Sequence, residues 1–204
     1  MKNTKVQKMV AISMLAAIGV VLQFIAFPII PAISFMKVDF SDIPVMIGMF
    51  LFGPLAGIAT AFIRSTLHLM MTGFSPDNLV GDVASFLATT IFTLPMYYFF
   101  RRKTHIGRNK FFGITLGILA MTAFMSVANY FVITPLYLYF FGLSAQQMLG
   151  MSLSKYVLIG VIPFNLIKGF IVSAVFLVLY AKLLPWLKRK QRSVEGTRAD
   201  SVTK

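Results

Sequence analysis

Cysteine is absent from this 204-residue sequence, and acidic residues are scarce, with six Asp and Glu against 19 Lys and Arg. Without cysteine the chain can form no disulfide, no thiolate zinc site and no thiol nucleophile. It has only two histidines and no HExxH motif, which argues against a zinc protease. Ser65 and His68 are close on one predicted helix, but nothing marks Ser65 as a nucleophile. The GxxxxGK(S/T) motif is also missing, so the chain itself is not expected to hydrolyse ATP.

Charged residues make up only 12% of the chain, whereas a soluble domain carries roughly 25%. Hydrophobic residues account for 58%, and the mean hydropathy is +0.82. These residues come in long blocks and do not alternate as the strands of a membrane barrel would. Only a helix satisfies its own backbone hydrogen bonds inside lipid. The sequence therefore predicts an all-α integral membrane protein.

The net charge of +13 reports topology and does not indicate a nucleic-acid partner. Of the 19 Lys and Arg residues, 15 fall in three clusters, at positions 2–8, 101–110 and 182–204. Long apolar blocks separate these clusters. Basic residues collect on the cytoplasmic side of a membrane. Both termini are therefore expected in the cytoplasm, which requires an even number of spans.

Hydropathy divides the chain into six predicted spans, since each needs about 20 apolar residues to cross the bilayer. They cover residues 6–27, 43–52, 54–71, 79–100, 111–141 and 152–184, with Gly53-Pro54 separating the second from the third. We interpret the first as a retained span, because no small-residue cleavage site follows it. The last two exceed 30 residues and are expected to tilt, to bend at Pro135 and Pro163, or to project beyond the membrane. Residues 1–190 would form one membrane domain, and residues 191–204 a polar, disordered tail.

Polar side chains inside spans are costly in lipid, so each is a candidate functional residue. Counting about 1.5 Å per residue places Asn129, Asn165, Lys168 and Asp82 at a similar depth, in the outer third of the membrane. The loop that contains Asp39 would lie above them. The sequence thus predicts a polar pocket that opens outward. As an alternative, the lysine could extend to the surface and the asparagines could join helices.

Other side chains near this level are less informative. Phe40, Tyr130 and Phe164 could stack on a flat ligand, although most phenylalanines in such a chain face lipid or core. Arg64 lies near mid-depth with His68 one turn away, and an ion pair with Asp82 is as plausible as ligand contact. In the first span, Ser13, Ala16, Ala17 and Gly19 form small-residue faces on which another helix could pack.

Several strings resemble a known family over nearly the whole chain, to about residue 190. They are VDFSDIP at 38–44, FGPLAG at 52–57, NYFV at 129–132, PLY at 135–137 and IPFNLIKG at 162–169. The first two are shared widely among the S components of energy-coupling-factor (ECF) vitamin importers. The NYFV and PFNLIKG strings resemble more narrowly the riboflavin-binding S components.

This resemblance implies a six-helix substrate-binding subunit of a bacterial plasma membrane, without enzymatic activity or a cofactor. Riboflavin would be bound as the transported substrate beneath the loop between the first two helices, with Asn129, Asn165 and Lys168 donating or accepting hydrogen bonds. The implied partners are a membrane T subunit and two cytoplasmic ATPases, and the S component would topple in the bilayer. The family usually docks through an Ala-x-x-x-Ala face. Here the best match is Ser13-x-x-x-Ala17, a departure from that pattern.

Two alternatives remain open on the sequence alone. The chain could be an S component for another vitamin, such as thiamin, biotin or a queuosine precursor. It could also be an intramembrane enzyme or an assembly scaffold.

Overall fold

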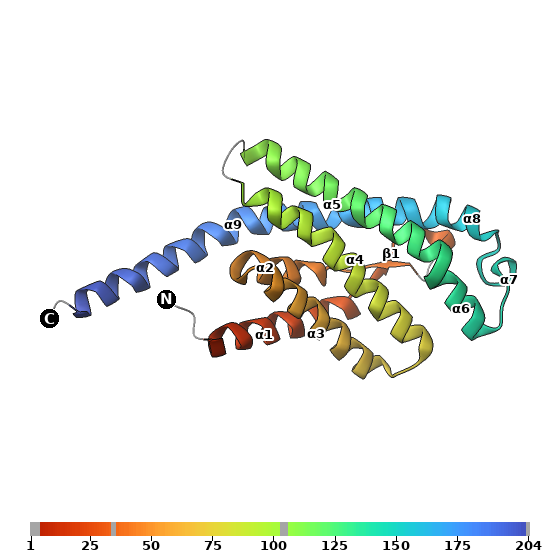
Figure 1. Cartoon of the computed structure of the whole chain (residues 1–204), viewed down its shortest axis with the longest axis horizontal. Coiled ribbons are helices and arrows are strands. Elements are labelled where there is room, and N and C mark those ends of the chain that lie inside the picture. Colours follow the sequence, from red (N-terminus) through yellow and green to blue (C-terminus); the bar gives the residue numbers. More distant parts are fainter. Residues whose placement is uncertain (1–4, 34–35, 103–105, 203–204) are drawn as a thin grey trace.

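Helices account for almost all of the chain in this computed structural model (Figure 1). The structure describes residues 5–33, 36–102 and 106–202, and for Ala32, Ile106 and residues 183–202 it describes the backbone only. The elements, in order, are α1 Lys5–Phe24, β1 Phe27–Pro28, the 3-10 turn η1 Pro31–Ile33, β2 Lys37–Val38, α2 Asp42–Phe52, α3 Pro54–Thr72, α4 Pro76–Phe100, α5 Ile106–Ala128, the π-helix η2 Asn129–Ile133, α6 Thr134–Phe141, α7 Ala145–Leu149, α8 Leu153–Tyr156, the π-helix η3 Val157–Val161 and α9 Ile162–Val202.

Within the described residues these elements form six membrane segments, namely α1, α2, α3, α4, the continuous rod α5–η2–α6 and the rod α8–η3–α9. Four are long and apolar enough to cross a membrane, and α2 is a shorter apolar helix. The remaining segment, α3, carries Arg64 and His68 and is packed against α1, α2 and α4. The predicted six-helix architecture is therefore confirmed.

The two ends of the bundle differ in charge and in structure. Figure 1 shows the start of α1, the end of α4 and the start of α5 at one end, and α6, α7 and α8 at the other. The first end carries Arg101 and Arg102, the exposed basic residues that follow α4. The positive-inside rule assigns that end to the cytoplasm and the end with α7 to the outside.

Gly53 separates α2 from α3, as the sequence predicted. Its φ of 98° lies in a region that side chains with a Cβ rarely occupy. Pro54 follows as the first residue of α3, where the missing N–H is not needed. A tight antiparallel pair results, and Gly57 allows the approach because a Cβ there would lie 2.5 Å from the Cβ of Met49.

Each long rod contains one π-helical turn just before a proline. η2 precedes Pro135, and η3 precedes Pro163. A proline has no N–H to donate, and its ring collides with the carbonyl one turn earlier. A wider turn relieves the collision, and such turns often occur at functional sites. A π turn thus lies next to each of the two prolines at which a bend was expected.

Two outer elements were not predicted. The loop after α1 contains an antiparallel pair of two-residue strands, in which Phe27 pairs with Val38 and Pro28 with Lys37. The loop after α6 contains the short helix α7, which begins with a capping box formed by Ser144 and Gln147. The backbone of α9 is described to Val202, but nothing tests the predicted boundary at residue 190 or the predicted disorder of residues 191–204, and both stay predictions.

Two groups of buried side chains hold the bundle together. The larger lies between α2, α4, α5 and α9, and it includes Met46, Phe92 and Phe176, each at most 2% exposed. The smaller joins the outer loop to α8 and η3 through Ile33, Tyr156 and neighbouring residues. A cavity lies between the two groups, because Met121 of the first and Tyr156 of the second both line it.

Candidate functional site

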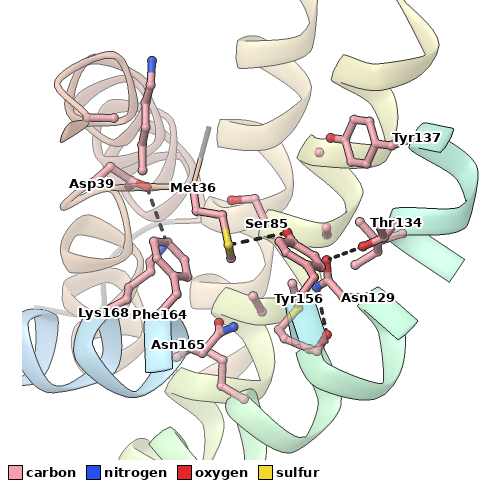
Figure 2. Close-up of a pocket in the computed structure, with 18 of the residues that line it drawn as sticks. Met36, Asp39, Ser85, Asn129, Thr134, Tyr137, Tyr156, Phe164, Asn165 and Lys168 are labelled. Carbon is pink, nitrogen blue, oxygen red and sulfur yellow. Dashed lines mark hydrogen bonds and ion pairs between the residues drawn. The ribbon is translucent and has the colours of Figure 1, made fainter. Parts of the chain in front are cut away.

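A cavity of about 610 Å³ lies toward the outer end of the bundle (Figure 2). It is surrounded by α4, the rod α5–η2–α6, the short helix α7, the rod α8–η3–α9 and the strand pair. Its walls are mostly apolar, with Met36, Met121, Met125 and Met148 prominent. A few polar groups project between them. This combination of volume and lining is typical of sites for small organic ligands, which occupy about 300–1,000 Å³.

Asn129 reaches the cavity from the first residue of η2. Its Nδ2 donates a hydrogen bond of 2.8 Å to the carbonyl of Met125, and its Oδ1 accepts one of 3.2 Å from the Thr134 hydroxyl (Figure 2). An amide group has two N–H donors and two lone pairs. One donor and one lone pair therefore remain after these two bonds, and the side chain is held in a fixed orientation.

Asn165 reaches the cavity from the first turn of α9, four residues after the end of η3. Its Nδ2 donates a 2.8 Å hydrogen bond to the carbonyl of Val161, and the residue is 3% exposed. Among the described residues its Oδ1 accepts no hydrogen bond. A buried amide oxygen is costly to leave unpaired, so this oxygen is available for a ligand. Phe164, the preceding residue, presents its ring to the same cavity.

Lys168 stands one turn further along α9, and its side chain is 13% exposed. Its Nζ lies 3.4 Å from Oδ2 of Asp39, which follows β2, and 3.6 Å from Oδ2 of Asp42 at the start of α2. Figure 2 shows the Lys168–Asp39 contact at the side of the cavity. A buried ammonium group needs such partners, because an unpaired charge is very costly to desolvate.

Arg64 lies behind these groups and is fully buried. One of its terminal nitrogens contacts Oδ1 of Asp42 at 3.2 Å, and the other donates 3.0 Å hydrogen bonds to Ser85 and Thr89 of α4. Of the two residues for which the sequence left an ion pair with Asp82 open, Arg64 therefore does not form it, because Arg64 points toward α2.

Asp82 instead pairs with His68. Its carboxylate lies 2.8 Å from Nδ1 of His68, and Gln23 of α1 donates to it at 3.2 Å. His68 and Gln23 line the cavity, whereas Asp82 lies behind them. Asp82 is thus placed to orient cavity residues.

Five of the predicted binding residues line the cavity together, namely Asp39, Asn129, Phe164, Asn165 and Lys168. Phe40, Tyr130 and Asp82 do not. Phe40 packs against Phe27 of the strand pair, and Tyr130 is 40% exposed on the outside of η2. A π turn changes which side of the rod each residue faces, and that rotation could not be predicted from residue spacing.

The cavity also contains residues that the sequence reading missed. Thr134, Tyr137, Tyr156 and Met36 line it, and Tyr137 donates a 3.0 Å hydrogen bond to the carbonyl of Asp77. Thr134 follows Asn129 by five residues, which is the spacing of hydrogen-bonded residues in a π turn. That spacing, just before Pro135, is a signal that could have identified it.

The predicted docking residues on α1 face different ways. Ala16 is fully buried in the bundle, and a Cβ on Gly19 would lie 3.2 Å from the Arg64 side chain, so this face packs internally. Ser13 and Ala17 are exposed. Of the predicted docking residues, only these two lie on the surface of α1, and their role in docking stays a prediction.

Comparison with known proteins agrees with this arrangement. A family model described as the substrate-specific component of ECF transporters matches residues 7–180. The chain belongs to this family. A solved structure reported as the S component of a bacterial ECF transporter superposes with a TM-score of 0.74 and 36% identity, over 91% of this chain and 99% of that one.

Two curated relatives extend the match to named transporters. The riboflavin transporter FmnP of Bacillus subtilis is 37% identical, over 92% of this chain and 97% of its own length. The riboflavin transporter RibU of Staphylococcus aureus is 38% identical, over 90% and 93%. This S component is accordingly a multi-pass protein of a bacterial cell membrane. Transport and not catalysis is its role, as the sequence indicated.

Proposed function

We propose that this S component captures riboflavin in the cavity beneath the strand pair and delivers it toward the cytoplasm. The observation that carries the proposal is the convergence of Asn129, Asn165 and Lys168 on one cavity, from two rods that each widen into a π turn. The printed names of its relatives in Bacillus subtilis and Staphylococcus aureus support the same substrate.

The lining suits the two ends of a flavin. The isoalloxazine ring is flat, with an apolar dimethylbenzene edge and a pyrimidine edge rich in carbonyls and nitrogens. Methionine side chains adapt to flat apolar ligands, and aromatic rings such as Phe164 stack on them. The amides of Asn129 and Asn165 can both donate and accept, and Lys168 can donate to a ring carbonyl or nitrogen. The ribityl hydroxyls need the same kind of partner.

The charges beside Lys168 favour an uncharged group on that side of the cavity. The carboxylates of Asp39 and Asp42 are balanced by Lys168 and Arg64. A cation such as thiamin would need an unpaired carboxylate there, and the carboxylate of biotin would need an unpaired cation there. Riboflavin is neutral at physiological pH, and its binding leaves the balance unchanged.

Energy for transport would come from partners. The sequence lacks a nucleotide-binding loop, and membership in the ECF family points to a shared transport machinery. A membrane T subunit and two cytoplasmic ATPases would complete the importer, with riboflavin as cargo and no resident cofactor.

An absorption spectrum of protein purified in detergent tests the substrate directly. We expect bands of a bound flavin, together with quenching of riboflavin fluorescence on titration of the ligand-free protein. Asn165→Ala should weaken binding by about 10-fold or more, because a buried polar contact is lost. Asn78→Ala is the matched control, since Asn78 bonds only carbonyls at the end of α3. Tight binding of thiamin or biotin with no response to riboflavin would refute the proposal.

A further inference from the structure

Arg64 does not line the cavity. It is the largest fully buried side chain of the described residues. A lone buried guanidinium is destabilising unless several acceptors surround it. Here four surround it, on the loop before α2, on α2 and on α4: the hydroxyl of Ser41 at 2.8 Å, the carboxylate of Asp42 at 3.2 Å, and the hydroxyls of Ser85 and Thr89 at 3.0 Å each. Burying a guanidinium costs desolvation free energy, and four acceptors hold this one in a single orientation, so we looked for a role of Arg64 beyond packing.

The acceptors of Arg64 lead directly to Lys168. Ser41 donates hydrogen bonds to Oδ1 of Asp39 through both its backbone N–H, at 2.8 Å, and its hydroxyl. The other oxygen of Asp39 holds the ammonium of Lys168. A second route runs through Asp42, whose Oδ1 faces Arg64 while its Oδ2 faces Lys168 at 3.6 Å. Both carboxylates therefore present one oxygen to the arginine side and the other to the lysine.

We infer that Arg64 is a positioning residue for substrate binding, acting through Asp39 and Asp42 to fix the ammonium of Lys168 against the bound ligand. This inference rests on the proposed function and adds to it a residue that does not itself line the cavity. The guanidinium holds the loop before α2 in place, and that loop carries Asp39. Without Arg64 as an anchor, Asp39 and Lys168 would pair in several geometries. The ammonium of Lys168 would then no longer direct an N–H to the ligand in one fixed orientation.

The geometry also explains why the residue is arginine. A guanidinium presents its donors in a rigid planar fork, so Arg64 can hold Asp42 and Ser41 with one nitrogen and α4 with the other. A lysine at this position would keep the charge but could not span both sides with a fixed direction. Arg64→Lys therefore separates the charge of the residue from its positioning role.

A double-mutant cycle between Arg64→Lys and Lys168→Met tests the inference by riboflavin fluorescence titration. Arg64→Lys alone is expected to weaken binding by about 10-fold, the usual effect of a disturbed charged hydrogen bond. In the Lys168→Met background the same change should weaken binding by no more than about twofold, because coupled residues give non-additive losses. If Arg64 only stabilised the fold, the losses of affinity from Arg64→Lys and from Lys168→Met would multiply in the double variant.

Two further variants complete the design. Ser65→Ala is the matched control on α3: Ser65 neighbours Arg64 and is 6% exposed, its hydroxyl has no hydrogen-bond partner among the described residues, and affinity should not change. Ser41→Ala interrupts one route without removing a charge, and it serves if Arg64→Lys does not fold. It should weaken binding by about threefold to tenfold, and again only when Lys168 is present.

The outcomes are distinguishable. Multiplicative losses in a chain that binds riboflavin would overturn the inference and leave the proposed function intact. Failure of the unchanged chain to bind riboflavin would overturn both. Non-additive losses for Arg64→Lys or Ser41→Ala, with an unaltered Ser65→Ala control, would establish the positioning role.

Discussion

Lys168 has two expected roles in this cavity, a hydrogen bond to the ligand and the neutralisation of nearby carboxylates, and its substitution can separate them. Its ammonium lies 3.4 Å from Asp39 and 3.6 Å from Asp42, and these three side chains are 13%, 11% and 2% exposed. Lys168→Met removes the cation and leaves Arg64 to balance two carboxylates. Breaking a buried pair in this way should lower the free energy of unfolding by about 3–5 kcal/mol. Loss of a charged hydrogen bond to the ligand should weaken riboflavin binding by about 10- to 100-fold.

The compensated variant Lys168→Met/Asp39→Asn separates these two effects. It removes one positive and one negative charge, and the amide oxygen of the new asparagine can still accept from Ser41. Stability should return to within about 1 kcal/mol of the unchanged chain, because no buried charge is left unpaired. Affinity should stay low, because the donor to the ligand is still missing.

Stability would be measured as thermal unfolding of the ligand-free protein in detergent, and affinity as quenching of riboflavin fluorescence. Lys155→Met is the matched control, since it removes an exposed lysine from the same membrane segment and should change neither quantity. Recovery of affinity in the compensated variant would show that Lys168 acts by charge balance alone. That result would refute the contact assigned to it.

Three other expectations follow from the structure. Thr134→Val removes the donor that orients the nearby cavity asparagine, and it should weaken riboflavin binding by about threefold to tenfold in the same titration, with little change in unfolding temperature. Gly117→Ala should destabilise the chain by about 1–3 kcal/mol in thermal unfolding, because its Cβ would lie 2.6 Å from a backbone oxygen of α4. Single cysteines at Gln146 and Arg102 should react with a membrane-impermeant maleimide from opposite sides of intact cells, Gln146→Cys from outside.

The glycine and cysteine predictions each have an internal comparison. Gly107→Ala on the same helix meets no atom within 4 Å in the described part of the chain, and it should be neutral or stabilising by up to about 1 kcal/mol. Equal destabilisation at both glycines would contradict the close packing of α4 on α5. The absence of native cysteine makes the labelling unambiguous. Reaction of both positions from the same side would contradict the topology.

The sequence was sufficient for the helices and their order, for physical reasons. A membrane imposes a minimum apolar length on each span, so hydropathy locates α1, α4 and the two long rods. The Gly53-Pro54 pair locates the break between α2 and α3, because a glycine with positive φ and a proline at a helix start both favour that junction. Depth along each rod also follows from a constant rise per residue, and it brought Asn129, Asn165 and Lys168 to one level.

Rotation about each helix axis could not be predicted in the same way. An ion pair of Arg64 with Asp82 was left open, but the arginine faces α2, and Asp42 is its partner. Tyr130 was a candidate for stacking on a ligand and lies on the outside of η2. The strand pair at Phe27 and Lys37 was missed because two-residue strands show no alternation of polar and apolar residues.

The two π turns connect the fold to the site. Each lies just before a proline inside a membrane rod, where a wider turn can accommodate the proline ring. Pro95 lies within the regular α-helix α4, so a proline alone does not dictate a π turn. Each π turn also brings an asparagine to the cavity, Asn129 at the first residue of η2 and Asn165 four residues after the end of η3. In both cases the amide donates back to the carbonyl four residues earlier and keeps its remaining polar groups for the cavity. A proline, a π turn and an asparagine therefore lie close together in both rods, and the two amides give a mostly apolar cavity two polar positions, where a molecule with apolar and polar edges can be held.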